Sequence, residues 1–217
     1  IEDAQEHGCN IIICHHPLMF RPVKKIVSVE SRSSLLINII RKGISVYSMH
    51  TNFDKFMYSY LAETIGYKNS RLLMKTDIIG EHQVGFGSLI VNDEPLILRD
   101  LLEKVKKALN VDYLLFTGDP EEQIWSIAFI NGSGGGSVER VIAGDKPDYI
   151  ITGDVGYHNA RYAADSGTAV IDAGHFGTEI IFKKLLAQTV AGIMNDYGES
   201  VQVVISDVEK NPLRLYK

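Results

Sequence analysis

The sequence is poor in cysteine and contains no long apolar run. Its 217 residues include two cysteines, Cys9 and Cys14. Two such close thiols in a chain of this size do not form a disulfide framework, so a reducing cytoplasm is the expected location. No apolar stretch approaches the roughly 18 residues needed to cross a bilayer, and we expect no membrane association. No signal peptide is visible, although the chain starts at Ile1 rather than Met.

The sequence also has no excess of positive charge. The 22 Lys and Arg residues are outnumbered by 27 Asp and Glu residues, which gives a net charge of −5. This balance argues against nucleic-acid binding over a large surface, although a local basic patch stays compatible with it. Hydrophobic residues make up 45% of the chain and charged residues 23%, as in ordinary globular proteins. The length suits one large α/β domain or two small lobes.

Short apolar runs that end abruptly in polar side chains alternate with amphipathic segments. Such runs, bounded by Gly or Pro, are typical of buried parallel strands, and the alternation is typical of an α/β protein. The pattern predicts helices at 1–8, 33–42, 58–65, 98–109, 138–143, 157–165 and from 180 to 190, and strands at 10–13, 44–49, 85–91, 113–116, 124–130, 148–151, 168–171 and 201–205.

The two ends of the chain share one pattern of strand, polar tip, helix, strand and polar tip. Residues 10–16 align in character with residues 148–154, and residues 43–52 align with residues 167–175. We therefore predict two similar, interlocked α/β lobes, at about 1–78 and 79–217, whose strand tips converge on one cleft. In open α/β sheets, chemistry lies just beyond the carboxyl ends of the strands.

Adjacent imidazoles follow the first predicted strand. His15 and His16 come directly after the apolar residues 11–13, and Pro17 follows them. In a continuing strand their side chains would point to opposite faces, so both can bind metal only where the backbone turns, or if each serves a different ion. The other interpretation is an ordinary polar entry into a loop.

A second pair of candidate ligands follows a later strand. His175 and Glu179 lie four residues apart, so a helix that starts at His175 places both on one face. An imidazole nitrogen and a carboxylate that can bridge two ions suit a divalent metal. Alone, the pair is better explained as one of many exposed pairs with this spacing, but it follows an apolar strand just as the first two histidines do.

Two more strand tips carry a His and an Asp. His50 and Asp54 supply either two ligands or a ligand and its orienting partner, and we favour Asp54 as the ligand. Capping of a helix start is the alternative. Asp154 and His158 could orient ligands, carry protons or bind substrate, or could simply cap a helix and lie on its solvated face. The Gly-Ser run at 132–137 fits no nucleotide-binding fingerprint; we expect a linker there, with an anion cradle as the alternative.

Four motifs in this order resemble a known family. They are His-His-Pro-Leu-Met-Phe-Arg-Pro at 15–22, His-Thr-Asn-Phe-Asp at 50–54, Tyr-Ile-Ile-Thr-Gly-Asp-Val-Gly-Tyr-His at 149–158 and Asp-Ala-Gly-His-Phe-Gly-Thr-Glu at 172–179. They resemble the Nif-three-like (NGG-interacting-factor-three-like) family, also called GTP cyclohydrolase I type 2 homologues. The resemblance covers nearly the whole chain, which is then a single domain of this family built of the two lobes.

The resemblance implies a toroidal homohexamer with a dinuclear metal cleft in each subunit. It implies two divalent ions per subunit (Zn, Mn, Fe or Co), held by His15, His16, Asp54, His175 and Glu179, with Glu179 as the bridge. The chain departs from the family pattern where Cys14 replaces a Thr and where a Gly-Gly-x-Asn-Asp stretch is missing after Asp54. Relatives usually carry further N-terminal residues including a strand, so an N-terminal segment is expected to be missing here.

Two functions of different classes fit these residues. The first is a metal-dependent hydrolase for a small phosphorylated or nucleotide-like substrate, with His158, His50 and Asp154 as catalytic candidates. An imidazole with an ordinary pKa near 6.5 suits a proton shuttle. The second is a non-catalytic, metal-stabilised ring that acts as a regulatory scaffold for a protein partner.

Overall fold

The computed structural model describes residues 1–216 and separates into two compact units. The first unit comprises Ile1–Phe53 and Phe182–Lys210; the second comprises Asp54–Ile181 together with residues 211–216. The lobe boundary expected near residue 78 therefore falls inside the second unit. The reason is that Arg71–Ile79 pairs as a strand with the chain that follows it, so this segment cannot be divided from that sheet.

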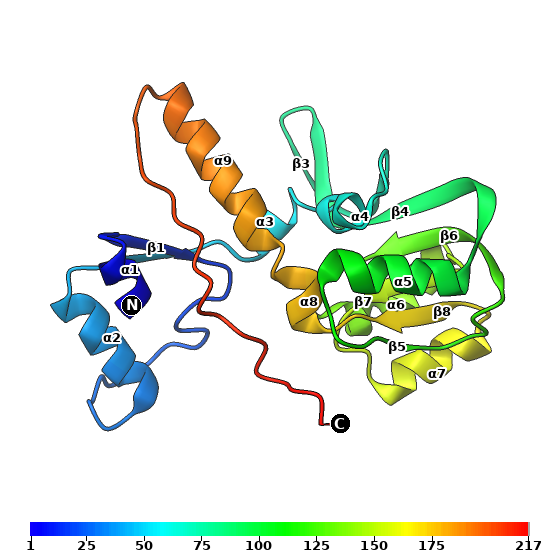
Figure 1. Cartoon of the computed structure of the whole chain (residues 1–217), viewed down its shortest axis with the longest axis horizontal. Helices are drawn as coiled ribbons and strands as arrows, with labels where there is room; N and C mark the ends of the chain where they lie inside the picture. The colour runs from blue at the N-terminus through cyan, green and yellow to red at the C-terminus, as the bar shows by residue number, and fades with distance from the viewer. Residues whose placement is uncertain (217) are drawn as a thin grey trace. The chain divides into compact units, whose positions relative to one another are not determined.

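The first unit is built around two parallel strands. β1 (Ile11–Cys14) pairs with β2 (Ser45–Ser48), and the connection between them contains α2 (Ser31–Arg41). This is the strand–helix–strand arrangement that the sequence predicts for this end of the chain. The other helices of the unit are α1 (Glu2–Glu6), α9 (Phe182–Asp196) and most of α3 (Thr51–Asp54) (Figure 1).

The prediction of a strand at residues 201–205 is wrong. After α9 ends, the described residues up to 216 form neither helix nor strand. The β-branched residues Val201, Val203 and Ile205 have the composition of a strand, but at least a third of each side chain is exposed. β-propensity reflects packing on a sheet, and composition alone does not supply the neighbouring strand.

The second unit contains one mixed six-stranded sheet in the order β3-β4-β6-β7-β8-β5. The central strands β6, β7 and β8 run parallel to one another, while β3, β4 and β5 are joined antiparallel. The strands are β3 (Arg71–Ile79), β4 (His82–Ile97), β5 (Leu115–Phe116), β6 (Gln123–Phe129), β7 (Tyr149–Thr152) and β8 (Ala169–Asp172). The helices are α4 (Tyr60–Ile65), α5 (Leu98–Leu109), η1 (Gly134–Ser137), α6 (Val138–Gly144), α7 (Tyr157–Asp165) and α8 (His175–Glu179).

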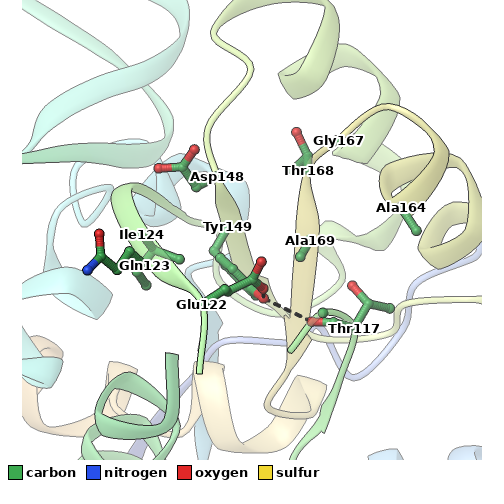
Figure 2. A pocket seen from close by; sticks show the side chains of 11 residues that line it. Thr117, Glu122, Gln123, Ile124, Asp148, Tyr149, Ala164, Gly167, Thr168 and Ala169 are labelled. Carbon is green, nitrogen blue, oxygen red and sulfur yellow. Dashed lines mark hydrogen bonds between the residues drawn. The ribbon is translucent and has the colours of Figure 1, made fainter. Parts of the chain in front are cut away.

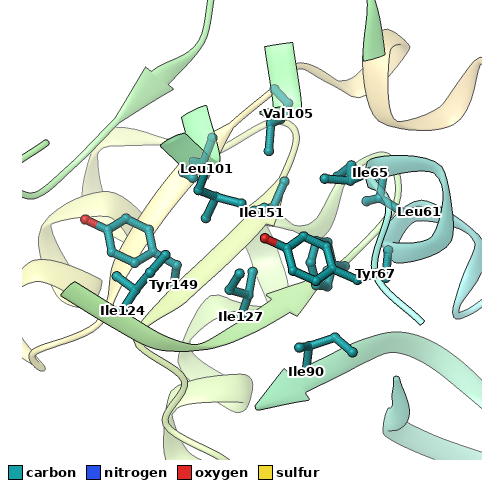
Figure 3. Close-up of a cluster of buried hydrophobic side chains, with 14 of the residues drawn as sticks. Leu61, Ile65, Tyr67, Ile90, Leu101, Val105, Ile124, Ile127, Tyr149 and Ile151 are labelled. Carbon is teal, nitrogen blue, oxygen red and sulfur yellow. The ribbon is translucent and has the colours of Figure 1, made fainter. Parts of the chain in front are cut away.

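Alternate residues of the central strands pack against helices on opposite faces of this sheet. Ile127 and Ile151 belong to a core with Leu61 of α4 and Leu101 of α5 (Figure 3). The neighbouring side chains of β6 and β7 pack instead with residues of α6 and α7, including Val141. Because both faces are covered, these strands read as unbroken apolar runs rather than as an alternating pattern.

Helices α6 and α7 are the crossover connections of this sheet. α6 joins β6 to β7 and α7 joins β7 to β8, so the carboxyl ends of all three parallel strands lie at one edge. The loops that leave this edge carry Gly132, Asp154 and His175. Residues far apart in the sequence are thereby brought together. Among residues 1–216, no helix is both long and apolar enough to cross a membrane.

Candidate metal site

Three imidazoles lie together in the first unit, just beyond β1 and β2. One nitrogen from each of His15, His16 and His50 lies within 4.8 Å of the others. The rings of His15 and His16 meet edge to face, with centroids 4.9 Å apart and planes at 83°. The two neighbouring side chains thus share one region because the backbone leaves the extended path after Cys14. The ring of His50 stacks on that of His15 at 4.6 Å.

The apolar residues around this three-imidazole group (His15, His16 and His50) fix one side of it. His15 is buried, with 9% of its surface exposed, and its ring packs against Phe182, the first residue of α9. Phe182 in turn packs edge to face on Phe53 of α3. His16 is exposed. The group is therefore anchored in the core at His15 and open to solvent at His16, as a site that admits an ion from solution requires.

The donor set of this group suits a transition-metal ion. Neutral imidazole is the common nitrogen ligand for Zn, Cu, Fe and Ni in proteins, and three protein ligands leave coordination positions for water or substrate. Asp54, which the sequence predicts as a ligand, is the last residue of α3 and belongs to the second unit. His50, predicted as an orienting or proton-carrying residue, stands inside the three-imidazole group.

His175 and Glu179 form the corresponding pair in the second unit. They are the first and last residues of α8, which begins directly after the loop that follows β8. Nε2 of His175 lies 3.0 Å from a carboxylate oxygen of Glu179, so both groups face the same space. Glu179 is the more buried of the two, with 15% of its side chain exposed against 34% for His175. One imidazole nitrogen and one carboxylate are ligands that Zn, Mn, Fe and Co all accept.

Asp154 contacts the other nitrogen of the same imidazole. Its carboxylate lies 2.7 Å from Nδ1 of His175. Burial lowers the pKa of His175, but the hydrogen bond to Asp154 and the negative charges of Glu179 and Asp154 outweigh it. The pKa of His175 therefore lies above its ordinary value of 6.5. His175 thus stands between two carboxylates, one at each ring nitrogen.

Gly132 packs directly against this pair. Its backbone is left-handed, with φ of +60°, and a Cβ there would overlap a carboxylate oxygen of Glu179 and lie 3.4 Å from Nε2 of His175. Its N–H donates to the hydroxyl of Thr178, which is fully buried within α8. The segment expected to be a linker is therefore packed structure that includes η1. The Gly-Ser composition could not predict this packing, because composition does not indicate which residues distant in sequence will contact the segment.

His158 lies near the start of α7 and is exposed. Its ring packs edge-on against that of Tyr157, 5.6 Å away. Its assignment as a catalytic candidate stays a prediction. So does the ligand set of His15, His16, Asp54, His175 and Glu179.

A separate pocket lies at the opposite edge of the second unit's sheet. It opens beside the first residues of β6, β7 and β8, namely Gln123, Tyr149 and Ala169 (Figure 2). The Tyr149 hydroxyl donates to the carbonyl of Thr117 at 3.1 Å and also contacts the Glu122 carboxylate. Burial raises the pKa of Tyr149, and the hydrogen bond to Glu122 raises it further. Tyr149 therefore stays neutral, as a structural hydroxyl does.

Comparison with known proteins bears on the chain as a whole. A family model described as Duf34/NIF3 (NGG1p interacting factor 3) matches residues 1–212. The chain belongs to this family. A Clostridium acetobutylicum member named GTP cyclohydrolase 1 type 2 homolog is 32% identical over 99% of this chain and 80% of its own length. A Helicobacter pylori member named GTP cyclohydrolase 1 type 2 is 35% identical over 98% of this chain and 78% of its own length.

Solved structures share the fold of this chain. A Bacillus cereus protein related to NIF3 matches 99% of this chain and 85% of its own chain, with a TM-score of 0.89 at 19% identity. A Staphylococcus aureus protein matches 99% of this chain and 83% of its own, with a TM-score of 0.88 at 23% identity. These likenesses confirm the predicted α/β class.

Proposed function

We propose that this member of the family is a metal-dependent hydrolase that holds two divalent ions. The observation that carries the proposal is the three-imidazole group, whose ligand nitrogens lie within 4.8 Å of one another. Three imidazoles this close repel one another once they are protonated, whereas neutral imidazoles can share a bound metal ion. The His175–Glu179 pair adds a nitrogen and an oxygen donor. The proposed ligand set is His15, His16, Asp54, His175 and Glu179, with Glu179 as the bridge. His50, the third imidazole of the group, is a proposed proton carrier beside these ligands.

A pair of divalent ions would supply Lewis acidity and a lower pKa for bound water. The residues of the chain would do the rest. The imidazoles and carboxylates hold the ions, and His50 or His158 carries protons at its ring nitrogens. Asp154 holds Nδ1 of His175. Zn, Mn, Fe and Co all suit these donors, and their availability decides which one is bound.

The proposed substrate is a small phosphorylated or nucleotide-like molecule. The proposal is supported by the names of the Clostridium acetobutylicum and Helicobacter pylori relatives, which assign those proteins to GTP cyclohydrolase 1 type 2 or its homologues. Arg21, Lys24 and Lys25 follow the two adjacent histidines in the sequence and are our candidates for phosphate contacts.

A metal-stabilised scaffold is the second candidate function. The description of the family as NGG1p interacting factor 3 names a partner interaction, and this observation favours a regulatory role. In this alternative the ions hold the fold and leave no position for substrate. A ring-shaped homohexamer and a cytoplasmic location are proposed for both alternatives on the strength of the family resemblance.

The test of the hydrolase is a screen of phosphoesters and nucleotides, including GTP, with metal-loaded protein. We expect turnover that a chelator abolishes and that added Zn²⁺, Mn²⁺, Fe²⁺ or Co²⁺ restores. The matched control is the same protein stripped of metal and reloaded with Mg²⁺, which prefers oxygen ligands. Full metal loading without turnover on any substrate would favour the scaffold.

A further inference from the structure

We propose that Asp154 is a positioning residue that fixes the ring of His175 in the orientation that turns Nε2 toward Glu179. The inference rests on the proposed metal centre. An ionised carboxylate only accepts hydrogen bonds, so the 2.7 Å contact places the proton on Nδ1 of His175. The opposite nitrogen, Nε2, faces the Glu179 carboxylate at 3.0 Å. The contact with Asp154 therefore holds the ring in the orientation that turns Nε2 toward the proposed ion.

The backbone of Asp154 is held in a conformation that few non-glycine residues adopt. Its φ is +57°, in the left-handed region, which costs an L-residue about 1–2 kcal/mol. Hydrogen bonds on both sides maintain it. The N–H of Gly153 donates to the carbonyl of Gly132 at 3.0 Å, and the N–H of Val155 donates to the carboxylate of Asp172 at 2.8 Å. Strain kept in this way is typical of residues with a functional constraint.

Asp172 connects the two loops that carry Asp154 and His175. One carboxylate oxygen accepts from the N–H of Val155, which follows Asp154. The other oxygen accepts from the N–H of Gly174, which precedes His175, also at 2.8 Å. A single side chain at the end of β8 thus sets the separation of the two loops. This separation places the Asp154 carboxylate within hydrogen-bonding distance of the His175 ring.

Glycines allow these loops to approach closely. A Cβ on Gly153 would lie 2.6 Å from the carbonyl carbon of Gly174 and 2.7 Å from Cα of His175. A Cβ on Gly135 would overlap the carbonyl oxygen of Asp154. Every contact of Asp154 described here either fixes its backbone or reaches His175. This arrangement favours a role in orienting the imidazole over a role as a mobile proton carrier.

The test removes the Asp154 side chain without straining the backbone. Asp154→Gly suits a left-handed φ better than the native residue does, so the fold should survive. We expect an unchanged melting temperature and a Kd for Zn²⁺ raised about 10- to 100-fold, the usual effect of losing a carboxylate that orients a ligand imidazole. Asp154→Asn keeps an acceptor oxygen and also tolerates this backbone. Its Kd for Zn²⁺ should therefore lie between those of the wild type and of Asp154→Gly.

The matched control is Lys146→Gly. Lys146 is another non-glycine residue with positive φ, at +43°, in the loop before β7 rather than after it. Its replacement makes the same backbone change away from His175 and should leave the Kd for Zn²⁺ unchanged. A wild-type Kd in Asp154→Gly would overturn the proposal. Unfolding of Asp154→Gly would overturn it too, since the residue would then hold the fold.

A second readout does not depend on metal. In metal-free full-length protein, the ring NMR shifts of His175, assigned by their loss in His175→Gln, should show one fixed ring orientation in the wild type. In Asp154→Gly the same signals should show a ring that samples more than one orientation. An equally ordered ring in both proteins would overturn the proposal. Failure of the wild type to bind Zn²⁺ would instead remove the proposed metal centre, and the shifts would still decide whether Asp154 orients the ring.

Discussion

At the scale of single residues, the candidate site depends on a glycine as much as on its ligands. Gly132 lies against Glu179 and His175 in a left-handed conformation. Its N–H donates to Thr178, one residue before Glu179. A side chain at this position would occupy the space that the Glu179 carboxylate needs. Gly132 therefore controls the position of the Glu179 carboxylate without being a ligand itself.

Substitution of Gly132 by Ala should destabilise the fold and weaken metal binding together. The positive φ costs an Ala about 1–2 kcal/mol, and the overlap of its Cβ with Glu179 adds to this. Urea denaturation and Zn²⁺ titration measure the two effects. The control is Gly136→Ala, because a Cβ there meets nothing within 4 Å and its φ is not positive. Equal stability and Kd in the two variants would contradict the packing described here.

The positions of the candidate ligands along the chain could be predicted from the sequence, but their neighbours could not. His15, His175 and Asp154 follow apolar runs, and the ends of such runs become strand ends because parallel strands are buried on both faces. The contact of Gly132 with Glu179 arises only when β6 and β8 are placed in one sheet. The place of His50 beside His15 likewise depends on the parallel pairing of β1 with β2.

At the scale of elements, α5 carries the core of the second unit. Leu98, Leu101 and Val105 recur on one face of the helix and are almost completely buried. The residues between them are exposed, apart from the half-buried Leu102. The last turn carries Lys106 and Lys107, and Asn110 ends the helix in a left-handed conformation. Cations near the carboxyl end and a left-handed cap both stabilise a helix terminus.

Leu101→Ala should lower the free energy of unfolding by about 2–5 kcal/mol, because it leaves a cavity among side chains that cannot fully collapse. Leu101 is 1% exposed and packs between the helix and the sheet. The control on the same helix is Glu103→Ala, where the side chain is exposed and the change should stay within about 0.5 kcal/mol. Chemical denaturation of both variants checks this; a loss below 1 kcal/mol for Leu101→Ala would contradict the packing.

Elements with strong periodicity could be predicted with their bounds, and elements defined by pairing could not. The expected helices at 98–109 and 157–165 are observed as α5 and α7. β3 was not expected, because its exposed residues Arg71, Lys75 and Asp77 give a polar sequence typical of an edge strand. Residues 201–205 present the reverse case, with the composition of a strand and no strand formed.

At the scale of the whole molecule, the strand–helix–strand pattern predicted for both ends of the chain is present in both units, but in sheets of different size. β1-α2-β2 in the first unit and β7-α7-β8 in the second are both parallel strand–helix–strand units. The first forms a two-stranded sheet, whereas the second is embedded in six strands. The sequence could not show this difference, because strand order is decided by pairing between distant segments. Local patterns predicted the shared strand–helix–strand unit.

The most direct test of the central claim is the metal content of gently purified full-length protein, measured by elemental analysis. Wild type and Glu179→Gln are compared, with Glu139→Gln, an exposed acid on α6, as the matched control. We predict about two transition-metal ions per chain in the wild type and in the control, and at least one ion fewer in Glu179→Gln with the fold intact. A wild type without metal, or a Glu179→Gln variant with an unchanged metal count, would contradict the account.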